Sequence, residues 1–279
     1  SMGRHLMGSP FVATTLATQA LVQNASETQK EHWLPQIAEG SAASLALTEE
    51  DGNWNLTEVG SHAQVQGDEL LLTAKKCFVL DAPQAAVIVV SAQVDGAARL
   101  IAVTADQLPE GALVRETVID ETRRSYTLEV DALALPADQL LPGADFASVE
   151  HAALLLLSAE MSGGLAGVLH VIIDYLTTRK QFDQYIGSYQ SLKHPTVQIL
   201  LSMEACRSHV YRAATLIAQS DNDAIEEAVR MAKAQGSEAF AFAGDRAVQF
   251  HGGFGFTYEC DAQLFLRRAL WCQYQFGDA

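Results

Sequence analysis

Residues 249–259, QFHGGFGFTYE, separate two long segments in which apolar residues recur at helical spacing. Glycine costs a helix interior about 1 kcal/mol relative to alanine. Gly252, Gly253 and Gly255 therefore indicate that one helix ends here and a turn begins. Glycines also let a ligand approach backbone N–H groups closely, so either a simple turn or a bound anion explains the break.

Outward from this break, the C-terminal half of the chain has helical periodicity. Apolar residues recur at helical spacing in four segments, 148–180, 190–220, 223–250 and 260–276. Short connections between successive helices favour antiparallel neighbours. We expect residues 146–279 to form an antiparallel four-helix bundle.

The middle of the chain has the pattern of β-structure. Short runs rich in β-branched residues, punctuated by Gly, Asp and Pro, occur at 62–74, 85–93, 98–105 and 124–135. Gly67 and Asp68 form a plausible hairpin turn. We expect residues 45–145 to form an antiparallel sheet or a small barrel.

The N-terminal 44 residues read as helix. Ser26 is a candidate N-cap with Gln29 at the capping-box position, and Gly40 is a candidate stop. The predicted fold class is therefore α+β: a short N-terminal helical segment (1–44), a β-domain (45–145) and a C-terminal four-helix bundle (146–279).

Composition excludes several function classes. The formal net charge of -16 argues against nucleic acid or an anionic membrane as the main partner, because both are bound through clustered Lys and Arg. We find no apolar run that suggests a membrane span and no signal peptide. The four cysteines form no CxxC pair and the eight histidines show no metal-ligand spacing, so we expect reduced thiols, no metal site and a cytoplasmic protein.

Three motifs carry a resemblance to a known family. The segments are WLPQIAEGSAASLALTEEDG (33–52), YLTTRKQFDQYIGSYQSLKH (175–194) and QFHGGFGFTYECDAQLFLRRA (249–269). In order and spacing they resemble the motifs of the acyl-CoA dehydrogenase family, in particular bacterial members that form heteromeric complexes. By this resemblance the family's N-terminal helical domain is largely missing.

The resemblance implies an FAD cofactor held between the sheet domain and the bundle, with its ADP half bound partly by a neighbouring subunit. The residues it places around the FAD are Leu47, Thr48, Phe78, Arg179, Gln181, Phe182, Gln190, Gln249, Gly252 and Gly253. Thr48 would donate to the flavin ring and Arg179 would bind the diphosphate, because a guanidinium forms two parallel bonds to phosphate. The glycine pair would offer its backbone amides.

The catalytic base is missing from both places where the family carries one. The reaction implied by the resemblance is α,β-desaturation of an acyl-CoA, in which a carboxylate removes the α proton and the β hydrogen leaves as hydride to the flavin. Phe276 occupies the usual Glu position, and Ala153 occupies the alternative one. Three explanations remain open: a displaced acid, a base from a partner chain, or loss of the chemistry. Candidates for a displaced acid are Asp278, Glu160 and Glu150.

The loop that normally follows LTE also differs, since EDGNWN (50–55) replaces a glycine-rich sequence, and Phe78 replaces the tryptophan beside the flavin. We expect an oxidoreductase acting on fatty acyl or steroid side-chain thioesters, with an electron-transfer flavoprotein as acceptor, in a homodimer, heteromer or heterotetramer. The alternatives are a non-catalytic partner subunit and a flavin monooxygenase. A nitroalkane oxidase is disfavoured because it too requires a carboxylate base.

Overall fold

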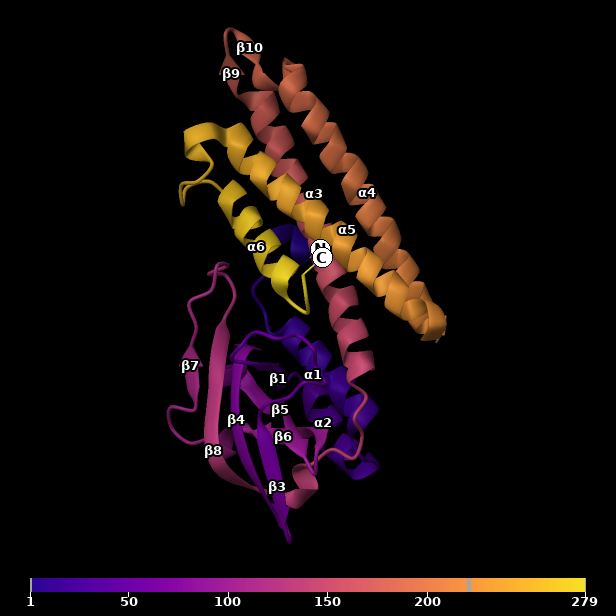
Figure 1. The fold of residues 1–279 in the computed structure, drawn as a ribbon. Helices are drawn as coiled ribbons and strands as arrows, with labels where there is room; N and C mark the ends of the chain where they lie inside the picture. Colours follow the sequence, from indigo (N-terminus) through magenta and orange to yellow (C-terminus); the bar gives the residue numbers. More distant parts are fainter. Residues whose placement is uncertain (1, 220–221, 279) are drawn as a thin grey trace. The chain divides into compact units, whose positions relative to one another are not determined.

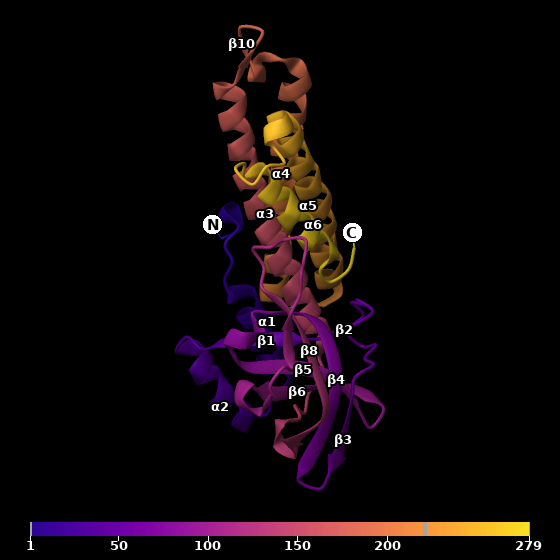
Figure 2. The ribbon, with the colours of Figure 1, turned by 90° about the vertical axis from the view of Figure 1, so that its left-hand side faces the viewer.

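The computed structural model describes residues 2–219 and 222–278 and divides into two compact units (Figures 1 and 2). One unit is Gly8–Ala152, and the other combines residues 1–7 with residues 153–279. The order of elements is two helices, a sheet and a helical bundle, which confirms the α+β class. The expected segment 1–44 is itself divided between the two units.

The first unit contains two helices and a sheet. Its elements are α1 (Phe11–Asn24), α2 (Glu27–Ala38), β1 (Ala42–Ala46), β2 (Thr48–Glu49), β3 (His62–Gln66), β4 (Glu69–Leu80), β5 (Ala85–Val94), β6 (Ala97–Thr104), β7 (Leu113–Arg115) and β8 (Ser125–Pro136). Helix α2 starts with the predicted capping box of Ser26 and Gln29. Helix α1 packs on β1, where the Thr14 hydroxyl donates to the Ala43 carbonyl.

The sheet has the strand order β1-β5-β3-β4-β8-β7, with β2 paired to β4 and β6 paired to β5. Gln66 pairs with Glu69, so Gly67 and Asp68 form the predicted hairpin turn. Most pairings are antiparallel, but β5 runs parallel to β1 and to the start of β3. The two parallel pairings depart from the expected antiparallel sheet or small barrel, because the chain reaches β5 from β1 by a crossover rather than by a hairpin.

The second unit is the predicted helical bundle. Its elements are α3 (Phe146–Thr178, of which residues from 153 belong here), β9 (Lys180–Gln181), β10 (Gln184–Tyr185), α4 (Gln190–Gln219), α5 (Asn222–His251) and α6 (Ala262–Tyr274). Helices α4 and α5 lie side by side, and α6 packs on α5 (Figure 1). One core cluster joins Leu154 of α3, Ala213 of α4 and Val229 of α5. All four helices fall within a few residues of the expected segments.

Helix α3 corrects one expectation from the sequence. It is long and apolar enough to cross a membrane by length and composition alone, although no such segment was expected. However, 56% of its most apolar window is buried inside the protein. Close approaches explain this burial: a Cβ added at Gly164 would collide with the Phe240 ring of α5. Helix α3 therefore has the properties of a core helix.

Candidate functional site

Phe78 lies at a break in the β4–β8 ladder. The register between these strands shifts between Lys76 and Val79, and Phe78 has a φ of 57°. A bulky residue in the left-handed region is strained, and such residues cluster at functional sites, as β-bulges do. The Phe78 N–H donates to both carboxylate oxygens of Glu116 at 3.3 Å. This carboxylate holds the strained backbone in place.

Thr48 lies directly beside this bulge, because it pairs with Cys77 across β2 and β4. The Thr48 residue is only 2% exposed, yet within the part of the chain that the structure describes its hydroxyl makes no hydrogen bond. The hydroxyl oxygen is not itself fully enclosed, so the group is available to a bound ligand. Leu47 is also buried, and its carbonyl accepts a hydrogen bond from Ser91 at 3.2 Å. The structure therefore brings Leu47, Thr48 and Phe78 together.

The other predicted cofactor residues lie in the bundle unit, and the first group of them forms a short hairpin. Arg179 follows α3, and the Ile186 N–H donates to its carbonyl at 2.9 Å. Gln181 pairs with Gln184 across the hairpin, and Phe182 at its tip has a φ of 52° and is 81% exposed. The side chains of Arg179, Gln181 and Gln190 are exposed. No residue that the structure describes covers these groups.

In the glycine turn, the backbone favours glycine at positions 252 and 255 but not at position 253. Gly252 has a φ of 59°, which glycine tolerates best. A Cβ at Gly255 would collide with the Val248 carbonyl, so close packing requires this glycine. Gly253 has neither constraint: its φ is not positive, and a Cβ there would meet nothing within 4 Å. Gln249, one turn earlier, is exposed. Among the described residues, no contact requires a glycine at position 253.

A ring stack joins the hairpin to the glycine turn. Tyr175 of α3 stacks on His251 at the end of α5, with ring centroids 4.1 Å apart and 23° between the planes. Arg179 is tied to Tyr175 by a backbone hydrogen bond of 2.9 Å, and Gly252 directly follows His251. The hairpin and the turn therefore lie at the same end of the bundle (Figure 1).

Neither expected position for a catalytic base is available for a carboxylate. Phe276 packs against the core cluster that contains Leu154 and Val229. Ala153 is completely buried. These two positions contribute to the interior of the bundle.

The displaced acids have other roles or lie at the surface. Glu160 forms an ion pair with Arg268, which is fully buried. Glu150 is half-buried near the start of α3. Asp278 is exposed and accepts a hydrogen bond from the Gln273 amide at 3.3 Å. Of the three, only Asp278 is a carboxylate exposed at the surface.

A buried lysine holds the C-terminal segment. The Lys233 ammonium donates to the carbonyls of Gln273 and Gly277 at 2.7 and 3.0 Å, and to the Ser237 hydroxyl at 3.3 Å. Burial lowers the pKa of Lys233 to about 8. No sequence motif pointed to Lys233, because two of these three partners are backbone carbonyls 40 and 44 residues away.

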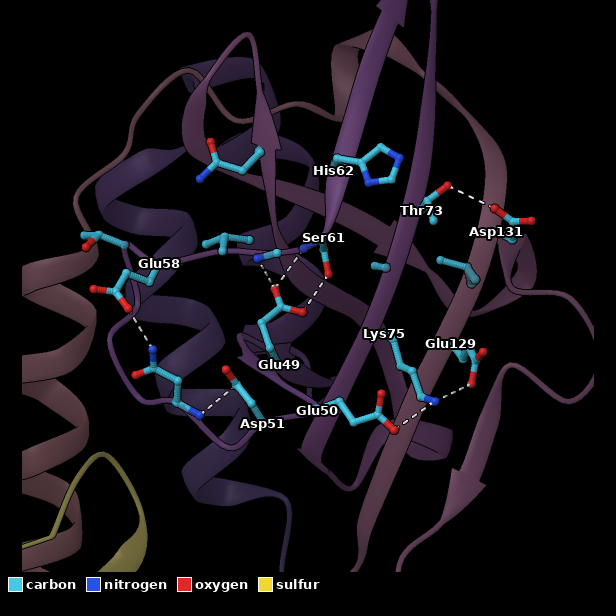
Figure 3. A pocket seen from close by; sticks show the side chains of 17 residues that line it. Glu49, Glu50, Asp51, Glu58, Ser61, His62, Thr73, Lys75, Glu129 and Asp131 are labelled. Atoms are coloured by element: carbon cyan, nitrogen blue, oxygen red, sulfur yellow. Dashed lines mark hydrogen bonds and ion pairs between the residues drawn. The ribbon is translucent and has the colours of Figure 1, made fainter.

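A large open cleft lies elsewhere on the sheet unit (Figure 3). Its volume is about 1220 Å³, and six carboxylates line it: Glu49, Glu50, Asp51, Glu58, Glu129 and Asp131. Lys75 forms ion pairs with two of them, Glu50 and Glu129. The remaining negative charge would repel the phosphates of a nucleotide or of CoA. Among the described residues, no group of three or more His, Cys, Asp or Glu side chains is arranged to hold a metal ion.

The order of two helices, a sheet and a helical bundle is the fold of solved acyl-CoA dehydrogenases. Residues 151–278 match the family model of the acyl-CoA dehydrogenase C-terminal domain. The chain is 31% identical over 247 residues to acyl-CoA dehydrogenase fadE12 of Mycobacterium bovis. That match covers 84% of this chain and 63% of the relative, so the chain spans less than two thirds of that protein's length. The chain belongs to the acyl-CoA dehydrogenase family.

Solved structures give the same fold. The Tcur3481-Tcur3483 steroid ACAD superposes with a TM-score of 0.89 at 25% identity, covering 100% of this chain and 75% of that one. The ChsE4-ChsE5 complex from Mycobacterium tuberculosis superposes with a TM-score of 0.88 at 24% identity, covering 99% of this chain and 74% of that one. This second likeness shows the fold alone.

Proposed function

We propose that this chain is an FAD-binding subunit of an acyl-CoA dehydrogenase and that the base for α,β-desaturation comes from a second, homologous chain. The observation that carries this proposal is a contrast between two sets of positions. Among the described residues, Phe78 and Phe182 on the cofactor side have positive φ values, and Arg179, Gln181, Gln190 and Gln249 are exposed. The positions for the base are occupied by Phe276, which is partly buried against the core of the bundle, and by Ala153, which is completely buried.

The residues present fit an FAD. The Thr48 hydroxyl makes no hydrogen bond among the described residues, and it could donate one to a flavin ring. At the bundle end, the exposed Arg179 side chain and the open backbone of Gly253 suit a diphosphate. When bound, FAD supplies the acceptor for the hydride that leaves the β carbon. Because these two groups of residues lie in different units of one chain, we propose that they bind the cofactor in an assembly.

The chain's own residues have defined roles in this proposal. Thr48 donates to the flavin ring, and Glu116 fixes the bulge that presents Phe78 beside it. Arg179 and the amides of Gly252 and Gly253 bind the diphosphate. The carboxylate that removes the α proton must lie beside the α carbon, in a place from which water is excluded. The partner chain would supply that group.

Two comparisons support a heteromer without deciding its composition. Solved structures of this fold carry the paired names ChsE4-ChsE5 and Tcur3481-Tcur3483, and the second is described as a steroid ACAD. A bulky acyl-CoA thioester, such as a steroid side-chain ester, is therefore the substrate class we propose, with a fatty acyl-CoA as the alternative. Electrons would pass to an electron-transfer flavoprotein.

The test is to purify the chain alone and co-expressed with a homologous acyl-CoA dehydrogenase chain that carries the usual Glu. Visible spectra are then recorded before and after addition of octanoyl-CoA or a steroid side-chain CoA ester. We expect flavin absorbance in the complex and bleaching by a CoA ester only there. Bleaching by the isolated chain would contradict the proposed source of the base. Absence of flavin from both preparations would contradict the proposal as a whole.

A second candidate function keeps the base within this chain. The exposed carboxylate of Asp278, two residues beyond Phe276, is the observation that favours it. Lys233 binds the carbonyl of the preceding residue, Gly277, which limits the movement of the segment. Substitution of Asp278 separates the two candidates, as described in the Discussion.

A further inference from the structure

Trp54 stacks on Phe78. The ring centroids are 6.0 Å apart and the planes are inclined by 16°, which is an offset stack. Trp54 belongs to the loop between β2 and β3, whose sequence departs from the family pattern. No sequence pattern indicated that its indole contacts Phe78.

The loop holds Trp54 by a clamp on its two neighbours. The side-chain amides of Asn53 and Asn55 both donate to the Glu58 carboxylate, each at 2.8 Å. In addition, the Asn53 N–H donates to Asp51 and the Asn55 N–H donates to the Asn53 side chain. These side-chain turns fix the backbone on either side of Trp54.

The loop is also fixed at its base. The Glu49 carboxylate accepts hydrogen bonds from the Gly60 N–H at 3.0 Å and from the Ser61 N–H at 3.1 Å (Figure 3). Lys76, completely buried in β4, forms an ion pair with Glu49. Both ends of the loop are therefore tied to β4 two residues before Phe78. The loop that carries Trp54 is therefore held in place by hydrogen bonds and an ion pair.

We infer that Trp54 is a positioning residue that holds the Phe78 ring against the flat face or edge of the isoalloxazine ring. This inference rests on the proposed function. Phe78 occupies a strained conformation that the Glu116 carboxylate supports at the backbone, and Trp54 supports it at the ring. An aromatic ring close to the Thr48 hydroxyl suits a planar heterocycle that carries hydrogen-bond acceptors.

The test compares Trp54→Leu, Trp54→Phe and the wild type, in the complex if the chain binds FAD only there. Titration with FAD measures the dissociation constant, and visible circular dichroism reports the surroundings of the bound flavin. We expect Trp54→Leu to weaken FAD binding about 2- to 10-fold, as loss of an aromatic pair does, and to change the dichroic spectrum. Trp54→Phe should restore both.

Trp33→Leu is the matched control, because Trp33 is a buried tryptophan of α2 in the same unit. It should lower the melting temperature without changing the flavin spectrum. If Trp54→Leu does not fold, Glu58→Gln, which weakens the Asn53 and Asn55 clamp, should give a smaller change in the same direction.

Two results separate the possible failures. FAD affinity and dichroism equal to wild type in Trp54→Leu, or in Glu58→Gln if it replaces that variant, would overturn the role of Trp54 and leave the proposed function standing. Absence of FAD from the wild type, alone and in the complex, would overturn both.

Discussion

Tyr175 and His251 stack at one end of the bundle, 4.1 Å between ring centroids, although 75 residues separate them in the chain. The His251 ring nitrogen Nδ1 lies 2.7 Å from the Ala247 carbonyl, which fixes the orientation of the imidazole. This stack places Arg179 and the glycine turn on a common support. Because both segments expose groups of the kind that bind phosphate, we propose that the stack supports a shared diphosphate site.

Gly253→Ala separates ligand binding from folding. A Cβ at this position meets nothing in the chain, so we expect little change in melting temperature, but weaker FAD binding because the methyl group occupies the approach to the backbone amide. Gly252→Ala is the comparison, and it should cost about 1 kcal/mol of stability because of its positive φ. Thermal melts and FAD titrations measure both effects. Equal FAD affinity for Gly253→Ala and wild type would remove the glycine turn from the site.

Asp278→Asn tests the source of the base. With the base on a partner chain, this variant in the complex should desaturate an acyl-CoA within 2-fold of the wild-type rate, because the amide keeps the shape of the carboxylate. Stopped-flow bleaching of the flavin measures that step. A loss of more than about 100-fold with FAD retained would assign the base to Asp278, since general-base catalysis contributes at least that factor.

The Glu160–Arg268 ion pair should be critical for stability. Arg268 is fully buried, so Glu160→Gln leaves a buried guanidinium with reduced compensation. Breaking such a pair costs about 3 to 5 kcal/mol, measurable by urea denaturation. The exposed pair Glu204–Arg207 is the control, and Glu204→Gln should change stability by less than about 1 kcal/mol. Similar small effects for both variants would show that the ion pair of Glu160 does not stabilise the fold, and Glu160 would again be a candidate for the catalytic base.

Lys233 should give the protein a defined dependence on alkaline pH. Burial lowers its pKa to about 8 in the folded state, whereas lysine titrates near 10.4 in an unfolded chain. Between these values the unfolded state binds more protons, so the contribution of Lys233 to unfolding free energy rises with pH by up to about 3 kcal/mol. Below about pH 8 it is constant.

Lys233→Met removes this contribution. The difference in stability between wild type and variant should therefore increase from about pH 8 to about pH 10.5, as measured by urea denaturation at each pH. The exposed Lys193→Met should give a profile parallel to the wild type. If the difference in stability between wild type and Lys233→Met does not change with pH, the pKa of Lys233 is not lowered in the folded state.

The sequence predicted those parts of the fold that depend on neighbouring residues. Ser26 with Gln29, the turn at Gly67 and the limits of the bundle helices all follow from local capping, turn and periodicity rules. The parallel pairing of β1 with β5 did not follow, because the partners are more than 40 residues apart.

The candidate site could be predicted only in part for the same reason. Motifs identified Thr48, Arg179 and the glycines, but not what surrounds them. The stack of Trp54 on Phe78 and the hydrogen bonds of Lys233 join residues that no motif connects. The assignments of FAD contacts to individual residues stay predictions.

The most direct measurement is the FAD dissociation constant of Arg179→Ala, with Arg207→Ala as a control for loss of a surface charge on the same bundle. Arg179 is exposed and forms no side-chain bond within the part of the chain described, so the fold should be unchanged. If the hairpin and the glycine turn bind the diphosphate together, Arg179→Ala should weaken FAD binding about 10- to 100-fold while Arg207→Ala leaves it unchanged. Equal affinity for Arg179→Ala, Arg207→Ala and wild type would contradict the account.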